Sequence, residues 1–257
     1  MRNYGYKPDI QKPEDYVLGG ITKLPREILQ ADKDWTPFLG VKEYQNLNQI
    51  EPFACVSFSV LNCAEILIKR KYGLDRNYSD RFLAMTSGTQ EGGNSPNAVA
   101  QSLHKEGVVL QDVWPFDQSI DSFEKFYSPI PQGIIDLAKE FLDEFDFKYE
   151  KVPSNHKSIS EALTYSPVLI SVSAWFERNG LYYRPEGFID NHATTLIYER
   201  EGEFRRVFDS YADGQDDPAL KDVEWEALPQ QCMRFWISRK EKKVSWFIRL
   251  LRSFKLI

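Results

Sequence analysis

Residues 55–72 read CVSFSVLNCAEILIKRKY, and this stretch decides the fold of the N-terminal half of the chain. Its first half is almost entirely apolar, basic residues at 69–71 close it, and Gly73 follows as a natural helix end. We predict a mostly buried helix that begins just after Pro52. Cys55 then lies at the amino end of that helix, where peptide dipoles and unpaired N–H groups favour a thiolate.

The chain as a whole divides into a helical part followed by a strand-rich part. Further helices are predicted at Asn97–Lys105, Ile134–Phe145 and Ser158–Tyr165, with a short one at Pro25–Ala31. After Ser166-Pro167, the β-branched and aromatic runs VLISVSAW, HATTLIYE, EFRRVFDSY and CMRFWIS predict antiparallel strands.

This order of elements predicts an α+β fold with two lobes and a cleft between them. We expect a helical lobe at about residues 45–150 and a β lobe, sheet or barrel, at about 151–238. Together they form a domain that spans residues 24–238. Residues 1–23 carry several prolines and scattered charge, and we expect them to form an extended arm on the surface.

Composition excludes several classes of protein. The 257 residues are 42% hydrophobic and 14% aromatic, enough for a packed core and a substrate cleft. A net charge of −6 argues against a nucleic-acid partner. No apolar run is long enough for a transmembrane helix, and the N-terminus lacks the pattern of a signal peptide. The odd count of three cysteines indicates free thiols, so we expect a cytoplasmic protein, with association with a virion as an open alternative.

The tail at residues 239–257 differs from the rest, with seven basic residues and one acidic residue. On a helical wheel its large apolar residues share one broad face: Trp246, Phe247, Leu250, Leu251 and Phe254. One interpretation is a terminal helix that docks on its own domain or on a protein partner. The other is a basic amphipathic helix that attaches to a membrane surface. The oligomeric state is not indicated.

Three residues could together carry nucleophilic chemistry. Among the three histidines, His104 and His156 lie in polar surroundings, whereas His192 leads into an apolar strand. Asp209 directly follows the next strand along the chain, so an antiparallel hairpin brings it beside His192. A carboxylate there can accept one imidazole N–H and orient the ring toward Cys55. The other two cysteines are read as core residues. No Cys/His cluster indicates a metal, and no cofactor is expected.

From about Leu24 to Ile237 the chain resembles the papain-like cysteine peptidases, peptidase family C1. The resemblance is carried, in order, by LPREILQADKDWTPF, Gln49 six positions before Cys55, Phe58-Ser59, Gly92-Gly93 with Ala98, Gly107 with Trp114-Pro115-Phe116, Ser166-Pro167-Val168, Asn191-His192-Ala193 and Asp209-Ser210-Tyr211. Each match is short, and together they cover most of the chain.

The resemblance implies a thiol-dependent peptidase that cleaves peptide bonds through an acyl-enzyme. Cys55 would be the nucleophile, His192 its base, Asp209 the group that orients the ring, and Gln49 the oxyanion donor. Gly92, Gly93 and Tyr211 would bind an extended peptide or protein substrate.

The chain also departs from the family pattern. Phe53 stands where the family has Gly and is expected to narrow the groove, Asp209 replaces Asn, and Tyr211 replaces Trp. The positions of the family's usual disulfide hold Pro52 and Gln90. Only some two dozen residues precede the Leu-Pro opening, so the usual inhibitory pro-domain is not expected.

Two other functions stay open at this point. The changes around Cys55 favour a weakly active or inactive binding protein of the same fold, within a larger assembly such as a virion. The Cys–His–Asp set is equally compatible with amidase or transglutaminase-like chemistry, in which an amine captures the acyl group or a different amide bond is cleaved.

Overall fold

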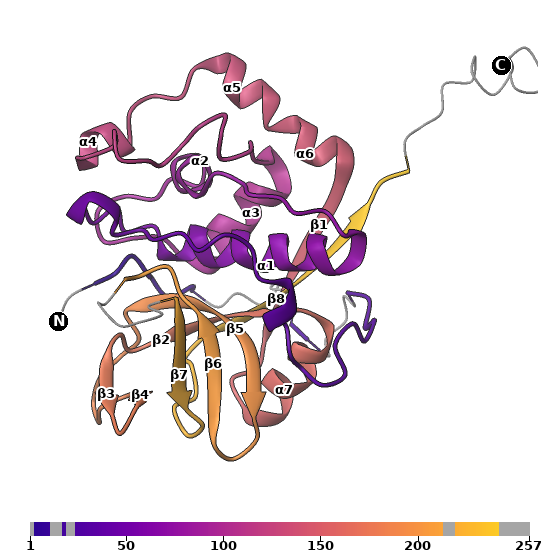
Figure 1. Cartoon of the computed structure of the whole chain (residues 1–257), viewed down its shortest axis with the longest axis vertical. Helices are drawn as coiled ribbons and strands as arrows, with labels where there is room; N and C mark the ends of the chain where they lie inside the picture. Colours follow the sequence, from indigo (N-terminus) through magenta and orange to yellow (C-terminus); the bar gives the residue numbers. More distant parts are fainter. Residues whose placement is uncertain (1–2, 11–16, 19–23, 213–218, 242–257) are drawn as a thin grey trace, which may run out of the picture.

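The computed structural model describes residues 3–10, 17–18, 24–212 and 219–241. Figure 1 shows the helices α1–α6 above an extended sheet, with α7 beside the sheet. The helices are α1 Cys55–Tyr72, α2 Asp80–Thr86, α3 Pro96–Glu106, α4 Phe123–Phe126, α5 Gln132–Leu137, α6 Lys139–Glu144 and α7 His156–Tyr165, with the 3-10 turns η1 Thr36–Phe38 and η2 Leu47–Gln49. The strands are β1 Phe145–Val152, β2 Val168–Val172, β3 Phe176–Arg178, β4 Leu181–Tyr183, β5 His192–Arg200, β6 Phe204–Phe208, β7 Leu220–Glu224 and β8 Cys232–Arg239. This confirms the α+β fold class.

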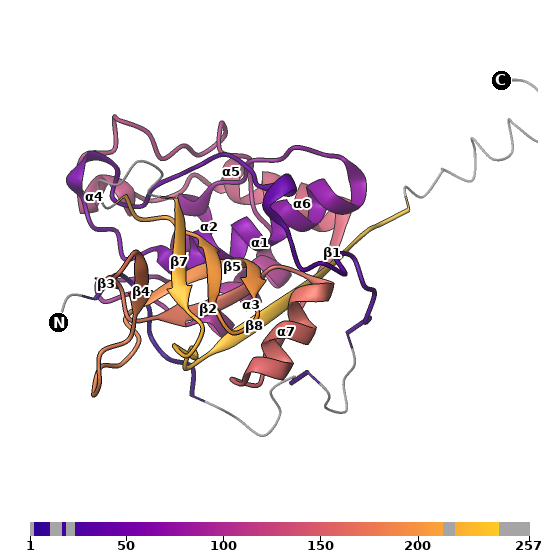
Figure 2. The same cartoon turned by 60° about the horizontal axis from the view of Figure 1, so that its bottom comes forward.

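The described strands form one sheet in the order β1-β8-β2-β5-β6-β7-β4-β3. All neighbours are antiparallel except β4 and β7, which are joined by a parallel bridge. β5 lies in the middle of the sheet, where it pairs with β2 on one side and β6 on the other. The four strand-like runs expected from the sequence become β2, β5, β6 and β8. Figure 2 shows α7 alongside β8 on the outer side of this sheet.

Helix α1 is the centre of the molecule and has the bounds predicted from its sequence. It contacts α2 and α3 in its own lobe, and β2, β5 and β8 in the other. A helix covered on so many sides must be apolar around most of its surface, which explains why the first half of α1 is mostly apolar. It ends at Gly73, whose left-handed backbone (φ 65°) lets its N–H donate to the Lys69 carbonyl over 2.9 Å.

Two expected helices differ in the structure. The helix predicted over Ile134–Phe145 is divided at Ala138 into α5 and α6, and Phe145 already belongs to β1. Strand β1 was not predicted, although its residues alternate between buried and more exposed, except at Lys148-Tyr149. The short helix expected at Pro25–Ala31 does not form, and this stretch has no regular structure.

Part of the expected surface arm is buried in the molecule. Tyr6 is only 3% exposed and pairs as a parallel bridge with Asn94 in the loop before α3. We call residues 3–9 the N-terminal segment. It contacts both lobes, because Tyr4 bonds to the β lobe and Gly5 to the helical lobe.

The predicted tail helix lies outside the described residues, which end at Glu241. Within the described part of the chain, no helix combines the length and the apolar character needed to cross a membrane.

Candidate active site

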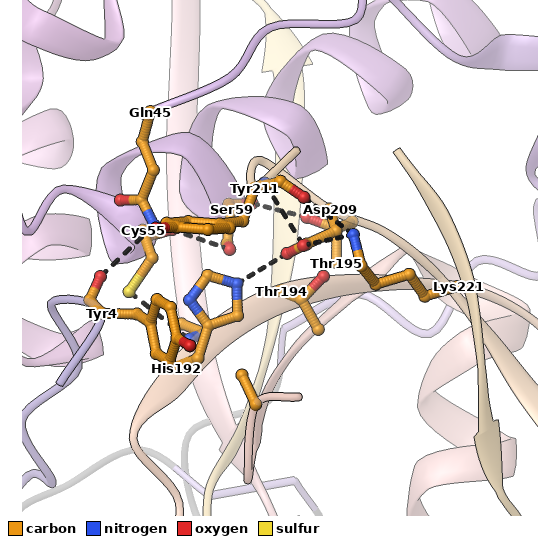
Figure 3. A network of polar contacts seen from close by, with 12 residues as sticks. Tyr4, Gln45, Cys55, Ser59, His192, Thr194, Thr195, Asp209, Tyr211 and Lys221 are labelled. Carbon is orange, nitrogen blue, oxygen red and sulfur yellow. Dashed lines mark hydrogen bonds and ion pairs between the residues drawn. The ribbon is translucent and has the colours of Figure 1, made fainter. Parts of the chain in front are cut away.

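Cys55 is the first residue of α1, and its sulfur is enclosed between the lobes. Ala54 is the N-cap, so Cys55 lies in the first turn, whose N–H groups have no acceptor within the helix. The backbone N–H of Ala193, on β5, donates to the sulfur over 3.4 Å (Figure 3). The residue is fully buried, at 0% exposure.

His192 and Asp209 form a short hydrogen bond beside this sulfur. The ring Nε2 lies 2.6 Å from Asp209 Oδ1, and both side chains are fully buried. Since an ionised carboxylate can only accept, Nε2 carries the proton toward Asp209, and in a neutral imidazole Nδ1 then has the lone pair. Nδ1 has no hydrogen-bond partner among the described residues, and Figure 3 shows it on the side of the ring that faces Cys55. The three residues are therefore arranged for proton transfer from the thiol to Nδ1.

The hairpin of β5 and β6 places the imidazole and the carboxylate together. The two strands are antiparallel, with Thr195 opposite Phe208, so the residue after β6 returns to the level of the start of β5. The Asp209 N–H donates to the Ala219 carbonyl over 2.7 Å, which fixes the backbone just beyond β6. This is the proximity that the sequence pattern predicted for His192 and Asp209.

The second oxygen of Asp209 is held by a buried cation. Lys221 Nζ, on β7, lies 3.0 Å from Oδ2, and the Tyr211 N–H donates to the same oxygen over 3.2 Å. Burial by itself would raise the pKa of Asp209, but His192 and Lys221 outweigh it, so this pKa lies below its ordinary value. The carboxylate therefore stays charged.

The glutamine next to Cys55 is Gln45 and not Gln49. Gln45 is fully buried, its Oε1 accepts from the Ala54 N–H over 3.1 Å, and its Nε2 donates to the Tyr4 carbonyl over 3.3 Å (Figure 3). Gln49 lies at the exposed end of η2, away from these groups. The loop between the glutamine and the cysteine is longer than the spacing of six assumed from the sequence, because it contains η2.

The N-terminal segment pairs with the main chain on both sides of Cys55. On the β side, the Tyr4 N–H donates to the Asn191 carbonyl over 3.0 Å. On the helical side, the Asn94 N–H donates to the Gly5 carbonyl over 2.9 Å, and the Lys7 N–H donates back to the Asn94 carbonyl over 2.9 Å. The chain's own residues thus lie where the resemblance places an extended substrate.

The predicted substrate residues Gly92 and Gly93 contact this segment. The Gly92 carbonyl accepts from the Asn3 side-chain amide over 2.9 Å. A Cβ on Gly93 would lie 1.9 Å from the Gly5 carbonyl oxygen, so only glycine allows the two backbones to come this close. These positions therefore accept a polypeptide backbone at close range.

Aromatic rings cover the imidazole. The rings of Tyr4 and Trp175 lie edge-on to His192, with centroids 5.5 and 5.4 Å away. The ring of Tyr211 packs edge-on against Tyr4, with 4.9 Å between centroids. The ring of Tyr211 also lies near the ring of His192, with 6.4 Å between centroids. The sequence predicted Tyr211 as a substrate-binding residue, and it did not predict Trp175 at this site.

Phe53 adopts a backbone conformation that suits glycine. Its φ of 56° lies in the left-handed region, which explains why the resembling family has Gly at this position. Its ring packs toward Phe123, with 6.4 Å between centroids. Its backbone lies directly against Gly5, so it borders the N-terminal segment.

Burial keeps Cys55 protonated in this conformation. The pKa of the Cys55 thiol is raised well above its ordinary value, first because the side chain is removed from water. The Ala193 N–H opposes this increase, whereas the nearby charges of Glu51 and Asp209 add to it. A thiolate would form here only after the site opens or when a proton moves to His192.

The residues that the structure describes contain no group of three or more His, Cys, Asp or Glu side chains able to hold a metal ion. All three cysteines are buried and free, and they form no disulfide.

Comparison with solved structures shows what this arrangement is similar to. Xylellain, a cysteine protease from Xylella fastidiosa, matches with a TM-score of 0.65 at 18% identity, over 95% of this chain and 99% of that one. The chain has a papain-like fold. The bromelain protease of Ananas comosus matches with a TM-score of 0.60 at 18% identity, over 78% of this chain and 96% of that one. The digestive procathepsin L 3 of Tenebrio molitor matches with a TM-score of 0.57 at 14% identity, over 78% of this chain and 68% of that one.

No protein-family model matches the sequence, and no curated protein does. The sequence pattern named Cys55, His192 and Asp209, which the fold brings together, but not Gln45 or Lys221, which lie beside them. The run LKDVE that forms β7 shows no regular alternation of apolar residues, so the sequence gave no signal that Lys221 is buried. The sequence of the loop before Cys55 likewise does not indicate that Gln45 lies next to Cys55.

Proposed function

We propose that the protein is a cysteine peptidase in which Cys55, His192 and Asp209 hydrolyse peptide bonds through an acyl-enzyme. One observation carries this proposal above all. The imidazole is fixed by Asp209 through Nε2, and its unpartnered Nδ1 faces a sulfur at the tip of a helix. This arrangement suits a nucleophile with its base.

The reaction begins when the Cys55 thiol gives its proton to His192 Nδ1. The sulfur then attacks the carbonyl carbon of the scissile peptide, forming a C–S bond while the carbonyl oxygen takes the negative charge. As the C–N bond breaks, the imidazolium donates its proton to the leaving amine. Water, deprotonated by His192, attacks the thioester and releases the carboxylic acid and the free thiol.

The Gln45 amide and the first turn of α1 stabilise the oxyanion in this proposal. Gln45 Nε2 already donates to a carbonyl, that of Tyr4, and the Ala54 N–H fixes the other end of the amide group. The N–H groups of the first turn, that of Cys55 among them, point toward the same negative charge. Losing one such donor typically costs about 10²–10³ in rate.

The substrate class is a polypeptide in an extended conformation. The main chain at Asn94 and Asn191 is already paired with another backbone, that of the N-terminal segment. Backbone pairing of this kind is independent of sequence, so side-chain contacts would set the preference for particular residues.

A substrate must displace the N-terminal segment to reach the sulfur. Cys55 and His192 are both fully buried, and Tyr4 lies over the imidazole. The enclosed conformation is therefore a latent one. The same enclosure favours the alternative of a binding protein with this fold, and only an activity measurement separates the two.

The test compares cleavage of a denatured protein substrate by the full chain with cleavage by its Cys55→Ala and Cys63→Ala variants. We expect cleavage that persists in Cys63→Ala and is lost in Cys55→Ala. Mass spectrometry of the products in ¹⁸O-water and in the presence of a free amine shows whether water or the amine captures the acyl group. Cleavage that survives Cys55→Ala excludes the proposed nucleophile. Absence of cleavage even after the N-terminal segment is displaced by Gly5→Ala favours a binding protein.

A further inference from the structure

Lys221 is a buried cation that pairs with the carboxylate of Asp209. It lies on β7 and is 2% exposed. Its ammonium contacts Asp209 Oδ2 at 3.0 Å and donates to the Tyr211 carbonyl over 2.8 Å. It also lies 5.1 Å from the centre of the Trp175 ring. Because a buried ammonium is costly unless it is paired, its presence here needs a reason.

Asp209 divides its two oxygens between two different groups. Oδ1 accepts from His192 and Oδ2 from Lys221 (Figure 3). The cation therefore fixes the plane of the carboxylate, and through it the plane of the imidazole. With a neutral side chain at position 221, Asp209 Oδ2 loses the lysine and keeps, of the two contacts described above, the hydrogen bond from the Tyr211 N–H.

The charges explain why a lysine stands here. In the reactive form the site holds a thiolate, an imidazolium and a carboxylate, which together carry one negative charge. Lys221 brings the summed charge of these four groups to zero. The resembling family has a neutral Asn at position 209, so Asp209 together with Lys221 restores the charge that an amide would give.

We propose that Lys221 is a positioning residue, which makes Asp209 act as the electrostatic equivalent of a neutral amide and holds the His192 ring in line with Cys55. This proposal rests on the proposed function, because it concerns the same triad. Lys221 itself touches neither the substrate nor the reacting atoms.

Other titratable groups face the same site and must be included in any pH study. Cys55 and Glu51 come from the helical lobe. The charges of Glu51 and of Asp209 both raise the pKa of the Cys55 thiol. Tyr4 comes from the N-terminal segment and Tyr211 from the segment after β6.

The test is a double-variant cycle of Lys221→Met and Asp209→Asn. Asp209→Asn leaves the buried Lys221 without its carboxylate, and Lys221→Met leaves Asp209 Oδ2 without its cation, so we expect each single change to lower the rate of peptide cleavage strongly. The neutral pair Asp209→Asn with Lys221→Met should be about ten-fold or more faster than either single variant, because paired residues are not additive. A double variant no faster than the singles overturns the proposal, as does full activity in Lys221→Met.

A matched control exists one residue further along β7. Arg206 on β6 and Asp222 on β7 form an ion pair at 2.7 Å, and Asp222 is the residue next to Lys221. Side chains of neighbouring residues in a strand point to opposite faces. The corresponding neutral pair, Arg206→Met with Asp222→Asn, should leave cleavage unchanged.

A readout independent of peptidase activity separates this proposal from the proposed function. The proton that His192 donates to Asp209 gives a far-downfield proton NMR signal, which His192→Ala assigns. We expect the signal to shift or broaden in Lys221→Met and to persist in Lys221→Arg, which keeps the charge. If the signal depends on Lys221 but no variant cleaves peptides, the peptidase assignment fails and the positioning role stands. A signal that is identical in Lys221→Met shows that the lysine only supports folding.

Discussion

The ring of Tyr4 lies edge-on to the imidazole of His192, with 5.5 Å between their centroids. The two residues are far apart in sequence, yet the Tyr4 N–H also bonds to the residue before His192. The N-terminal segment therefore closes the site that it contacts. Whether the protein acts at all depends on how easily this contact is broken.

The first prediction concerns Gly5, where any side chain would clash with the backbone of Phe53 and displace the N-terminal segment. A Cβ there would lie 2.2 Å from the Phe53 carbonyl group, and its φ of 107° already disfavours other residues. We expect Gly5→Ala to displace the segment and to speed alkylation of Cys55 by about ten-fold or more, equivalent to about 1.4 kcal/mol of lost segment binding. Mass spectrometry after a short iodoacetamide pulse measures this rate.

Gly202→Ala is the control for backbone strain alone. Gly202 has a φ of 76°, but a Cβ there meets no atom within 4 Å. It should leave the alkylation rate of Cys55 as it is in the unchanged chain. Equal rates in the Gly5 and Gly202 variants would show that the segment does not protect the sulfur.

A second prediction concerns pH. Burial raises the pKa of Cys55, so the alkylation rate of the full chain should rise only at strongly alkaline pH. In Gly5→Ala, water and the helix terminus reach the sulfur, and the rise should move to lower pH. A pH profile that does not differ between the two proteins contradicts burial by the segment as the cause.

The same shift affects stability. A thiol whose pKa is raised on folding stabilises the folded state below its unfolded pKa of about 8.5, and this stabilisation is lost as pH rises further. The thermal unfolding midpoint of the chain should therefore fall above about pH 8.5, and fall less in Cys55→Ser. The decline should be reduced and not abolished, because burial also raises the pKa of Cys63 and Cys232.

The third prediction decides between two glutamines. Gln45→Ala should lower kcat by about 10²–10³, because it removes an N–H donor that already holds a carbonyl oxygen beside Cys55. Gln49→Ala, on the exposed end of η2, should change kcat by less than about two-fold. Steady-state kinetics on one peptide substrate measures both. A larger loss of kcat in Gln49→Ala than in Gln45→Ala would show that Gln49, six positions before Cys55, is the oxyanion donor.

The sequence could predict those parts of the molecule that depend on local pattern. Helix α1 was found with its correct bounds because its apolar run and Gly73 are contiguous. The β5–β6 hairpin was found because a short polar turn joins two apolar strands, and it placed Asp209 beside His192. Strand β1 was missed because its first residue was taken as the end of the amphipathic run before it.

The remaining features depend on contacts between distant residues. Nothing local distinguishes Gln45 from Gln49, since the length of the turn between the glutamine and Cys55 decides which one reaches the site. The N-terminal segment has the proline and charge content of a surface arm, and only its fit against Gly93 and Asn191 places it inside. Such contacts are a property of the folded backbone, which periodicity does not encode.

The last prediction concerns a buried ion pair between two strands of the β lobe. Glu150 on β1 and Arg234 on β8 are opposite one another in the sheet, and each side chain is 1% exposed. Arg234→Met leaves the Glu150 carboxylate buried without its cation, which should lower the free energy of unfolding by about 3–5 kcal/mol. Adding Glu150→Gln removes the stranded charge, so the double variant should recover most of that loss. Urea denaturation followed by tryptophan fluorescence gives both values.

Asp136→Asn, in the exposed pair with Lys139, is the comparison and should lower the free energy of unfolding by less than about 1 kcal/mol. A double variant as unstable as Arg234→Met alone would mean that the arginine acts through packing against Tyr165, whose ring centre lies 5.0 Å from the guanidinium carbon, and not through its charge.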